Sequence, residues 1–100
     1  MPIKILQINY KLNAPRAKYE SENLPYAQPI ADLPGLRWKV WIINEEASEA
    51  GGIYLFDDDA AVQAFLDGPI IAEMKGDPTL SIKAFDVIAD LTTVTRGPVR

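Results

Sequence analysis

The sequence predicts a single α+β domain in which helices cover one face of a four-stranded antiparallel sheet. Three observations lead to this prediction. Four stretches have the residue types of β-strands, and two stretches between them have helical spacing, so the element order is β-α-β-β-α-β. Apolar residues make up 48% of the chain and charged residues 24%, as in ordinary globular proteins. A length of 100 residues suits one core, so we expect one domain over residues 1–100.

The first strand is predicted over residues 3–10, where alternation separates two sets of side chains. One face carries Ile3, Ile5, Gln7 and Asn9, and the other carries Lys4, Leu6, Ile8 and Tyr10. This alternation is compatible with a β-strand.

A helix is predicted over residues 16–33. One side of it carries Tyr19, Asn23, Tyr26, Ile30 and Leu33. Because Pro25 and Pro29 fall inside this segment, we expect a kinked or two-part helix that ends at Pro34 and Gly35.

A β-hairpin is predicted between Gly35 and Phe56, where two apolar runs flank an acidic connector at residues 44–49. Strict alternation in its first strand predicts two faces: Leu36, Trp38, Val40 and Ile42 on one, and Arg37, Lys39, Trp41 and Ile43 on the other. A hairpin at a surface normally has one polar face, and this one has none. The sheet is therefore expected to be covered on both faces.

The second half of the chain completes the fold. Asp57 to Asp59 open a helix over residues 60–66, whose core-facing residues are predicted to be Ala61, Ala64 and Phe65. Gly68 ends it, and Pro69 begins a short helix through Met74. The last strand is predicted over residues 81–88, and the tail from Asp90 has no clear pattern.

This order corresponds to a ferredoxin-like βαββαβ fold with both helices on one face of the sheet. A second copy of the chain is the simplest cover for the other face. Two such sheets packed face to face give a dimeric α/β barrel with two-fold symmetry, so a homodimer is expected.

Composition excludes several classes of function. A net charge of −4 and a pI near 4.6 argue against nucleic acid as a partner. No apolar stretch approaches the roughly 20 residues of a membrane helix. The opening Met-Pro-Ile-Lys leads at once into a strand and leaves no room for a signal peptide, so we expect a cytoplasmic protein without membrane contact.

The chain has no cysteine and no histidine. It therefore lacks disulfides, a thiol nucleophile, the commonest general base and the usual haem ligand. The acidic runs, residues 57–59 and 45–49, are predicted to cap a helix and to form a solvated turn, and we expect no metal site and no cofactor. Chemistry must rest on carboxylates, Lys, Tyr, Arg, amides or the substrate itself.

Tyr54 is the best polar candidate for a site. It shares a strand face with Gly52, which opens space beside it, and its phenol is predicted to hydrogen-bond a ligand or relay a proton. The two tryptophans fall on opposite faces of one strand, so one is expected to line a pocket for an aromatic ligand and the other to lie in the dimer interface. The alternative is that all three aromatic residues only fill the core.

Lys39 and Arg37 lie on a strand that should be covered, where unpaired charges are rare. One interpretation is an interface ion pair with Asp86 or Glu49. The other is a cation that stabilises a phenolate or superoxide, which makes Lys39 a candidate catalytic residue beside Tyr54. The predicted binding residues are Trp38, Trp41, Asn9, Tyr10, Phe56 and Phe65.

Two blocks of the hairpin, residues 38–41 (WKVW) and residues 49–56 (EAGGIYLF), resemble the YdhR family of monooxygenases. Further similarity lies in residues 6–8, 34–35 and 83–87, so the resemblance spans nearly the whole chain. It implies a dimeric α/β barrel and a cofactor-independent monooxygenase that oxidises a polycyclic phenol or anthrone-like molecule with O2. The alternatives are a non-catalytic binding module for aromatic molecules and a non-redox isomerase or lyase on the same barrel. Haem degradation is disfavoured by the missing histidine.

Overall fold

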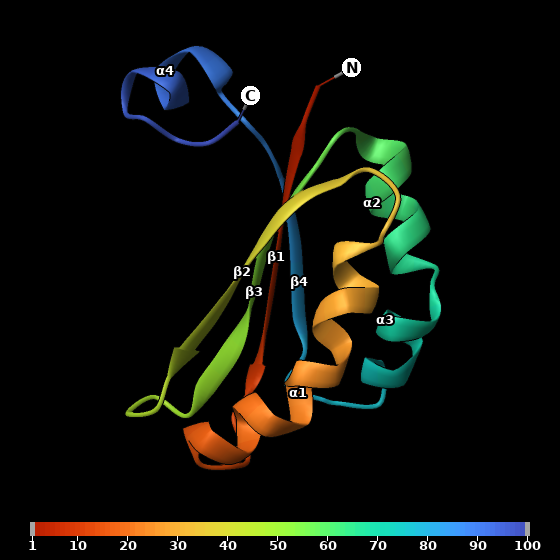
Figure 1. Cartoon of the computed structure of the whole chain (residues 1–100), viewed down its shortest axis with the longest axis vertical. Coiled ribbons are helices and arrows are strands. Elements are labelled where there is room, and N and C mark those ends of the chain that lie inside the picture. The colour runs from red at the N-terminus through yellow and green to blue at the C-terminus, as the bar shows by residue number, and fades with distance from the viewer. Residues whose placement is uncertain (1, 100) are drawn as a thin grey trace.

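The computed structural model describes residues 2–99 and confirms the βαββαβ order (Figure 1). Its first half contains β1 (Lys4–Lys11), α1 (Arg16–Ala31), β2 (Leu36–Asn44) and β3 (Glu49–Phe56). Its second half contains α2 (Asp59–Leu66), α3 (Pro69–Met74), β4 (Ser81–Asp86) and α4 (Ala89–Val94). The strands form one antiparallel sheet in the order β2-β3-β1-β4.

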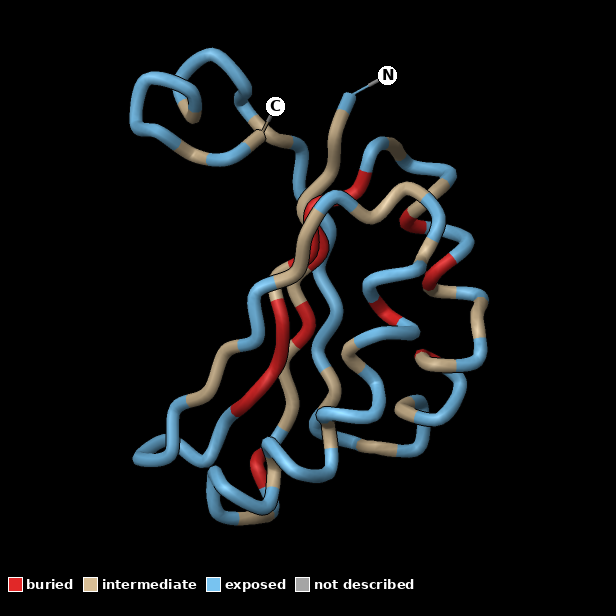
Figure 2. The backbone as a smooth tube through the Cα atoms, viewed as in Figure 1, coloured by how far each residue is buried: buried red, intermediate tan, exposed pale blue. Residues whose placement is uncertain are grey.

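Helices α1, α2 and α3 lie on the same side of the sheet, and we call this side the inner face (Figure 1). The core forms between the inner face and these helices. Its buried residues are Leu6, Ile8, Tyr54 and Phe56 from the sheet and Ile30, Val62, Phe65 and Ile71 from the helices. Figure 2 shows that β4, at one edge of the sheet, is exposed along its length, whereas β2, at the other edge, mixes exposed and intermediate residues.

Among residues 2–99, no helical layer covers the opposite, outer face over most of its length (Figure 1). Cross-strand pairing assigns apolar residues of all four strands to it: Ile5, Trp38, Val40, Ile42, Ile53, Leu55 and Phe85. Val40 is 51% exposed and Phe85 47% exposed. The outer face is therefore an apolar surface that this chain alone leaves partly open to water.

A β-bulge changes the predicted faces of β2. Leu36 pairs with Phe56 and Trp38 pairs with Leu55, so Arg37 is one extra residue between them. The prediction that Leu36 shares a face with Trp38 is wrong, because the extra residue reverses the alternation. Leu36 packs against the inner core, whereas Trp38 lies on the outer face.

Helix α1 is unbroken through Pro25 and Pro29, so the prediction of a helix in two parts is wrong. Both prolines are exposed, and Ser21, whose carbonyl loses its helical partner at Pro25, is exposed too. Water can satisfy such carbonyls, which reduces the penalty for proline inside the helix.

Helix α2 begins as predicted, with the side chain of Asp58 accepting a hydrogen bond from the Ala61 amide at 2.9 Å. Its buried residues are Val62 and Phe65, so the predicted core position of Ala64, which is exposed, is wrong. Residues three positions apart lie on the same face of a helix. In α2, which begins at Asp59, Val62 and Phe65 are the pair that faces the core.

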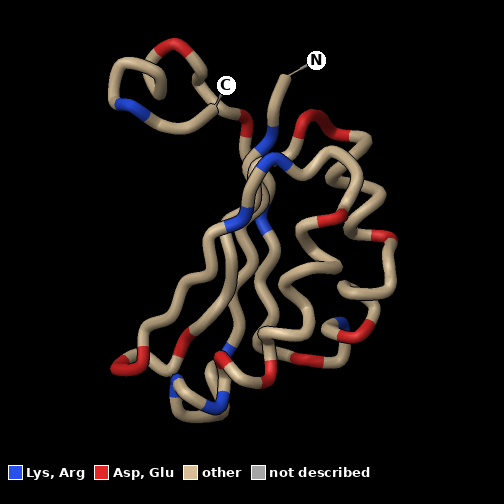
Figure 3. The backbone as a smooth tube through the Cα atoms, viewed as in Figure 1, with Lys and Arg blue, Asp and Glu red and all other residues tan. Residues whose placement is uncertain are grey.

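Helix α3 has the predicted bounds, with Pro69 as its first residue. Strand β4 ends at Asp86 instead of continuing to Ile88, and the tail forms the short α4. Basic residues are dispersed among acidic ones along the described chain (Figure 3). Within residues 2–99, no helix combines the length and apolar character needed to cross a bilayer.

Candidate functional site

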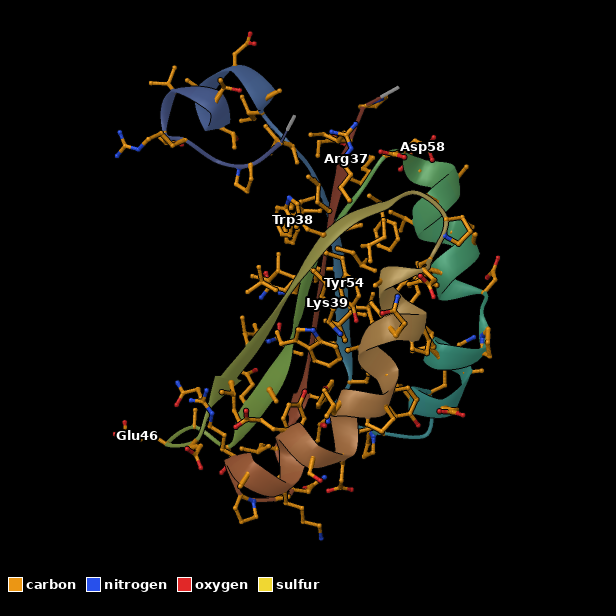
Figure 4. All side chains as sticks on the ribbon, viewed as in Figure 1. Arg37, Trp38, Lys39, Glu46, Tyr54 and Asp58 are labelled. Atoms are coloured by element: carbon orange, nitrogen blue, oxygen red, sulfur yellow. The ribbon has the colours of Figure 1, made fainter. Side chains whose placement is uncertain are left out.

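A cavity of about 390 Å³ lies between the inner face of the sheet and α1. The sheet contributes Ile8, Tyr10, Lys39, Trp41, Gly52 and Tyr54 to its wall. The helices contribute Tyr19, Asn23, Tyr26 and Ile30 from α1 and Ile70 and Met74 from the α3 region. Figure 4 shows Lys39 and Tyr54 between the sheet and α1, with Trp38 on the other side of the sheet.

Strand pairing brings Lys39 against the aromatic wall. Lys39 pairs with Tyr54 across β2 and β3, and its next inner-face neighbour, Trp41, pairs with Gly52. A Cβ on Gly52 would lie 2.5 Å from Lys39 Cε, so the missing side chain makes the room that the lysine occupies. Lys39 Nζ lies 3.3 Å from the Trp41 ring centroid and 4.6 Å from that of Tyr54.

The amine of Lys39 has no acidic partner among residues 2–99. The predicted ion pairs with Asp86 or Glu49 are absent there, because Asp86 pairs with Lys4. Arg37, the other predicted cation, pairs with Asp57 at 2.6 Å. Desolvation by burial lowers the pKa of Lys39 to about 7, so neutral and protonated amine coexist near neutral pH.

Tyr54 packs against two phenylalanines at the base of the cavity. Its ring centroid lies 6.0 Å from Phe56 and 5.1 Å from Phe65, and the residue is 3% exposed. Its hydroxyl has no hydrogen-bond partner within residues 2–99, and no buried polar side-chain atom of this part is unsatisfied, so the hydroxyl opens into the cavity. Burial raises the pKa of Tyr54, so its phenol stays protonated at neutral pH and can donate.

Tyr10 of β1 and Tyr19 of α1 form a hydrogen-bonded pair on the same wall. Their ring centroids are 6.4 Å apart. On the next turn of α1, Asn23 donates a hydrogen bond from Nδ2 to the Tyr19 carbonyl at 2.9 Å. Burial, and then the bond to Tyr19, raise the pKa of Tyr10. Tyr19 was not among the predicted site residues, although its place on the polar-aromatic side of the helix was the signal for it.

Carboxylates line another part of the cavity wall: Glu22 on α1, Glu73 on α3 and Asp77 in the turn that follows. Tyr26 donates a hydrogen bond to Glu73 at 3.3 Å. The amide and hydroxyl of Thr79 donate to Asp77 at 2.8 and 2.6 Å and lower the pKa of Asp77. These negative charges favour an uncharged ligand over an anionic one.

Of the predicted site residues, the structure brings Tyr54, Lys39, Trp41 and Tyr10 together around the cavity. Phe56 and Phe65 pack beneath Tyr54 in the core and do not line it. The other two predicted residues belong to the outer face. Trp38 donates a hydrogen bond from Nε1 to the Pro98 carbonyl at 2.7 Å, and Asn9 accepts one from Gln7 at 2.9 Å.

The arrangement combines three chemical properties in one cavity. The neutral form of Lys39 can accept a proton, the protonated Tyr54 can donate one, and the rings of Trp41 and Tyr54 suit a flat aromatic ligand. Fold and cavity together define a class: small ferredoxin-like α+β proteins with an aromatic pocket beneath the helices. Within that class, the chain belongs to the YdhR family, because the family model described as "Putative mono-oxygenase ydhR" matches residues 5–98.

Several solved structures share the fold, among them those of three proteins with known or proposed activities. SnoaB, a cofactor-independent oxygenase from Streptomyces nogalater, is 15% identical, with 87% of this chain and 94% of that chain covered and a TM-score of 0.68. An antibiotic biosynthesis monooxygenase from Deinococcus radiodurans, itself described as putative, is 17% identical, with coverages of 84% and 91% and a TM-score of 0.66.

A heme-degrading protein from Mycobacterium tuberculosis is 20% identical to this chain. The alignment covers 88% of this chain and 94% of that one, with a TM-score of 0.61. No curated protein is similar enough in sequence to count as a relative. At these identities the structural likenesses establish the fold, and the family model establishes a monooxygenase-like family.

Proposed function

We propose that this protein is a cofactor-independent monooxygenase that oxidises a polycyclic aromatic phenol or an anthrone-like small molecule with O2. The observation that carries the proposal is the Lys39 amine, which lies between the rings of Trp41 and Tyr54 in an aromatic cavity without an acidic partner in residues 2–99. Such an amine can act as a base toward an acidic C–H or O–H group. Membership of the YdhR family supports the same reaction class.

In this proposal the substrate supplies the electrons. Neutral Lys39 accepts a proton from the reacting carbon of an anthrone, and the resulting anion is delocalised over the fused rings. The anion transfers one electron to O2, giving a substrate radical and superoxide, which combine to form a C–O bond. Desolvation in the cavity and stacking on Trp41 favour this geometry.

Protons complete the reaction. The bound peroxide takes a proton from the Lys39 ammonium or the Tyr54 hydroxyl, and the O–O bond then breaks as the second hydrogen leaves the carbon. One oxygen atom becomes the new quinone carbonyl. The other leaves as water with the two hydrogens that the substrate lost, so one O2 is consumed per quinone.

We also propose that the working protein is a homodimer formed through the outer faces of two sheets. The partly exposed Val40 and Phe85 lie on this face, and further exposed apolar residues are Ile88, just before α4, and Leu91 in α4, each 65% exposed. Contiguous apolar surface of this kind is typical of a protein interface. Two-fold pairing would cover the same residues on both copies.

The first test is oxygen uptake by the purified protein with anthrone and dithranol, without added metal, flavin or haem. The expected result is protein-dependent uptake with one quinone formed per O2, after subtraction of autoxidation measured with boiled protein. Binding without uptake, seen as quenching of the fluorescence of Trp38 or Trp41, would contradict the oxygenase and favour the alternative of a binding module.

Tyr54→Phe tests the proton role within that assay. Loss of the hydroxyl removes a proton donor but keeps the ring that packs on Phe56 and Phe65. We expect kcat to fall at least tenfold while the substrate Kd changes less than threefold, within the usual range of general acid catalysis. Equal effects on kcat and Kd would assign Tyr54 to binding alone.

A further inference from the structure

We infer that Lys39 is also a covalent carbonyl-binding site, whose amine forms an imine with an uncharged aromatic aldehyde or ketone that enters the cavity. This activity shares a residue with the proposed function. It needs neither O2 nor an acidic C–H group in the ligand, so it can be tested separately.

Imine formation requires a lysine whose amine is neutral and reachable. The geometry of Lys39 meets both requirements: Nζ lies against the Trp41 and Tyr54 rings, has no acidic partner in residues 2–99, and lines an open cavity of about 390 Å³. Lysines in desolvated pockets are activated in this way. The lowered pKa of Lys39, about 7, fits this environment, whereas an ordinary exposed lysine near neutral pH is almost wholly protonated.

The chemical step balances without an added oxidant or reductant. The Lys39 nitrogen adds to the carbonyl carbon and gives a carbinolamine. The carbinolamine hydroxyl then leaves as water, which carries away the carbonyl oxygen and both hydrogens of the neutral amine. Tyr54, whose ring centroid lies 4.6 Å from Nζ, presents its hydroxyl on the same wall and can protonate the departing hydroxyl.

The wall of the cavity indicates which carbonyl compounds fit. Trp41 and Tyr54 offer aromatic surface, while Glu22, Glu73 and Asp77 contribute negative charge. A carboxylate on the ligand would be repelled by these three groups. We therefore expect benzaldehyde to react and its anionic relative, para-carboxybenzaldehyde, to react poorly.

The test is reductive trapping on the full chain. The protein is incubated near pH 7 with benzaldehyde and cyanoborohydride, which reduces an imine to a stable amine, and the adduct is located by peptide mapping and mass spectrometry. We expect Lys39 to be labelled at least tenfold faster than Lys4, Lys11, Lys18, Lys75 or Lys83. Labelling spread evenly over these lysines would overturn the inference.

Two variants sharpen the result. Lys39→Arg retains a cation that cannot form an imine and should lose the fast label, whereas Lys83→Arg, a change at an exposed position, should keep it. A fast label that persists in folded Lys39→Arg would overturn the inference. Should Lys39→Arg fail to fold, the peptide map of the unmodified sequence decides the question by itself.

The remaining outcomes separate the two proposals. Selective labelling of Lys39 without oxygen uptake on anthrones would support the carbonyl site and contradict the oxygenase. Oxygen uptake without selective labelling would do the reverse. If para-carboxybenzaldehyde labels Lys39 as fast as benzaldehyde does, the assignment to uncharged carbonyl compounds is wrong.

Discussion

Gly51 and Gly52 are adjacent residues whose missing side chains serve different purposes. A Cβ on Gly52 would lie 2.5 Å from Cε of Lys39, near the end of a flexible side chain. A Cβ on Gly51 would lie 1.9 Å from the carbonyl oxygen of Ile8, which is backbone of the neighbouring strand. The first contact can be relieved by moving one lysine, together with a small shift of the Tyr54 ring, whose Cε1 would lie 3.2 Å away, whereas the second requires moving a strand.

This contrast gives a matched pair of substitutions. We expect Gly52→Ala to lower the free energy of unfolding by less than about 1 kcal/mol but to displace the Lys39 amine and reduce oxygen uptake and trapping at least tenfold. Gly51→Ala should cost more than about 2 kcal/mol, because it overpacks backbone against backbone. Urea unfolding and both assays measure the difference. Equal destabilisation by the two alanines would contradict this reading of the glycines.

Lys39 should also couple stability to pH. Its pKa is about 7 in the folded chain and near the ordinary value of 10.5 when unfolded, so between these limits the unfolded chain binds one more proton. The free energy of unfolding contributed by Lys39 therefore rises with pH above about 7 and is constant below it.

The measurement compares the unmodified sequence with Lys39→Met by urea unfolding at several pH values. Their difference in unfolding free energy should shift by about 1 kcal/mol in favour of lysine between pH 7 and pH 9, allowing for solvent screening of a partly exposed amine. Lys18→Met, at an exposed position of α1, is the matched control and should give no comparable shift. A flat difference for Lys39→Met as well would mean that the amine is solvated.

The sequence predicted part of this site for a clear physical reason. Alternation within one strand places Lys39 beside Trp41, and the same rule places Tyr54 beside Gly52. The same alternation puts Asn9 and Tyr10 on opposite faces of β1, so only one of these two predicted binding residues could have lined the cavity. The contact between Tyr10 and Tyr19 was not predictable, because it depends on how α1 crosses the sheet, which no local pattern encodes.

At the scale of elements, the acidic residues at the start of α2 are a local signal for the beginning of a helix. The Asp58 side chain accepts from the Ala61 amide, one of the amides that a helix start leaves without a partner. Asp58→Ala should lower the free energy of unfolding by about 1 kcal/mol, since an N-cap is lost. Asp59→Ala, in the exposed first turn, should cost less than about half of that. Thermal or urea unfolding measures both losses. If Asp59→Ala cost more than Asp58→Ala, charge and not capping would stabilise the start of α2.

The order and type of the elements were predictable because each is signalled locally by alternation, helical spacing, caps or turn residues. The bulge at Arg37 was not. Hydrophobic alternation shows which residues of a strand share a face only when one face is polar. Because β2 has apolar residues on both faces, one extra residue leaves no trace in its sequence pattern. The short α4 was missed because none of its residues is buried and it has no side-chain cap.

At the scale of the whole molecule, the proposed dimer depends on the outer face. Phe85→Glu places a charge on that face, where Phe85 is 47% exposed, and burying it in an interface would be unfavourable. We expect the molar mass measured by light scattering to fall from two chains to one. Leu24→Glu, on the exposed side of α1 where Leu24 is 74% exposed, should leave the mass unchanged. If the unmodified protein already had the molar mass of one chain, the homodimer would be contradicted.

The extra residue in β2 also has a genetic consequence. Leu36 and Lys39 are three positions apart, and both face inward only because Arg37 is an extra, unpaired residue between them. Losing the codon for Arg37 while Leu36 stayed anchored on Phe56 would remove the bulge and leave every later pair of β2 and β3 in place. Lys39 would still pair with Tyr54 and Trp41 with Gly52, so both would keep facing the cavity. A single in-frame deletion at the bulge would thus spare the reactive lining of the pocket.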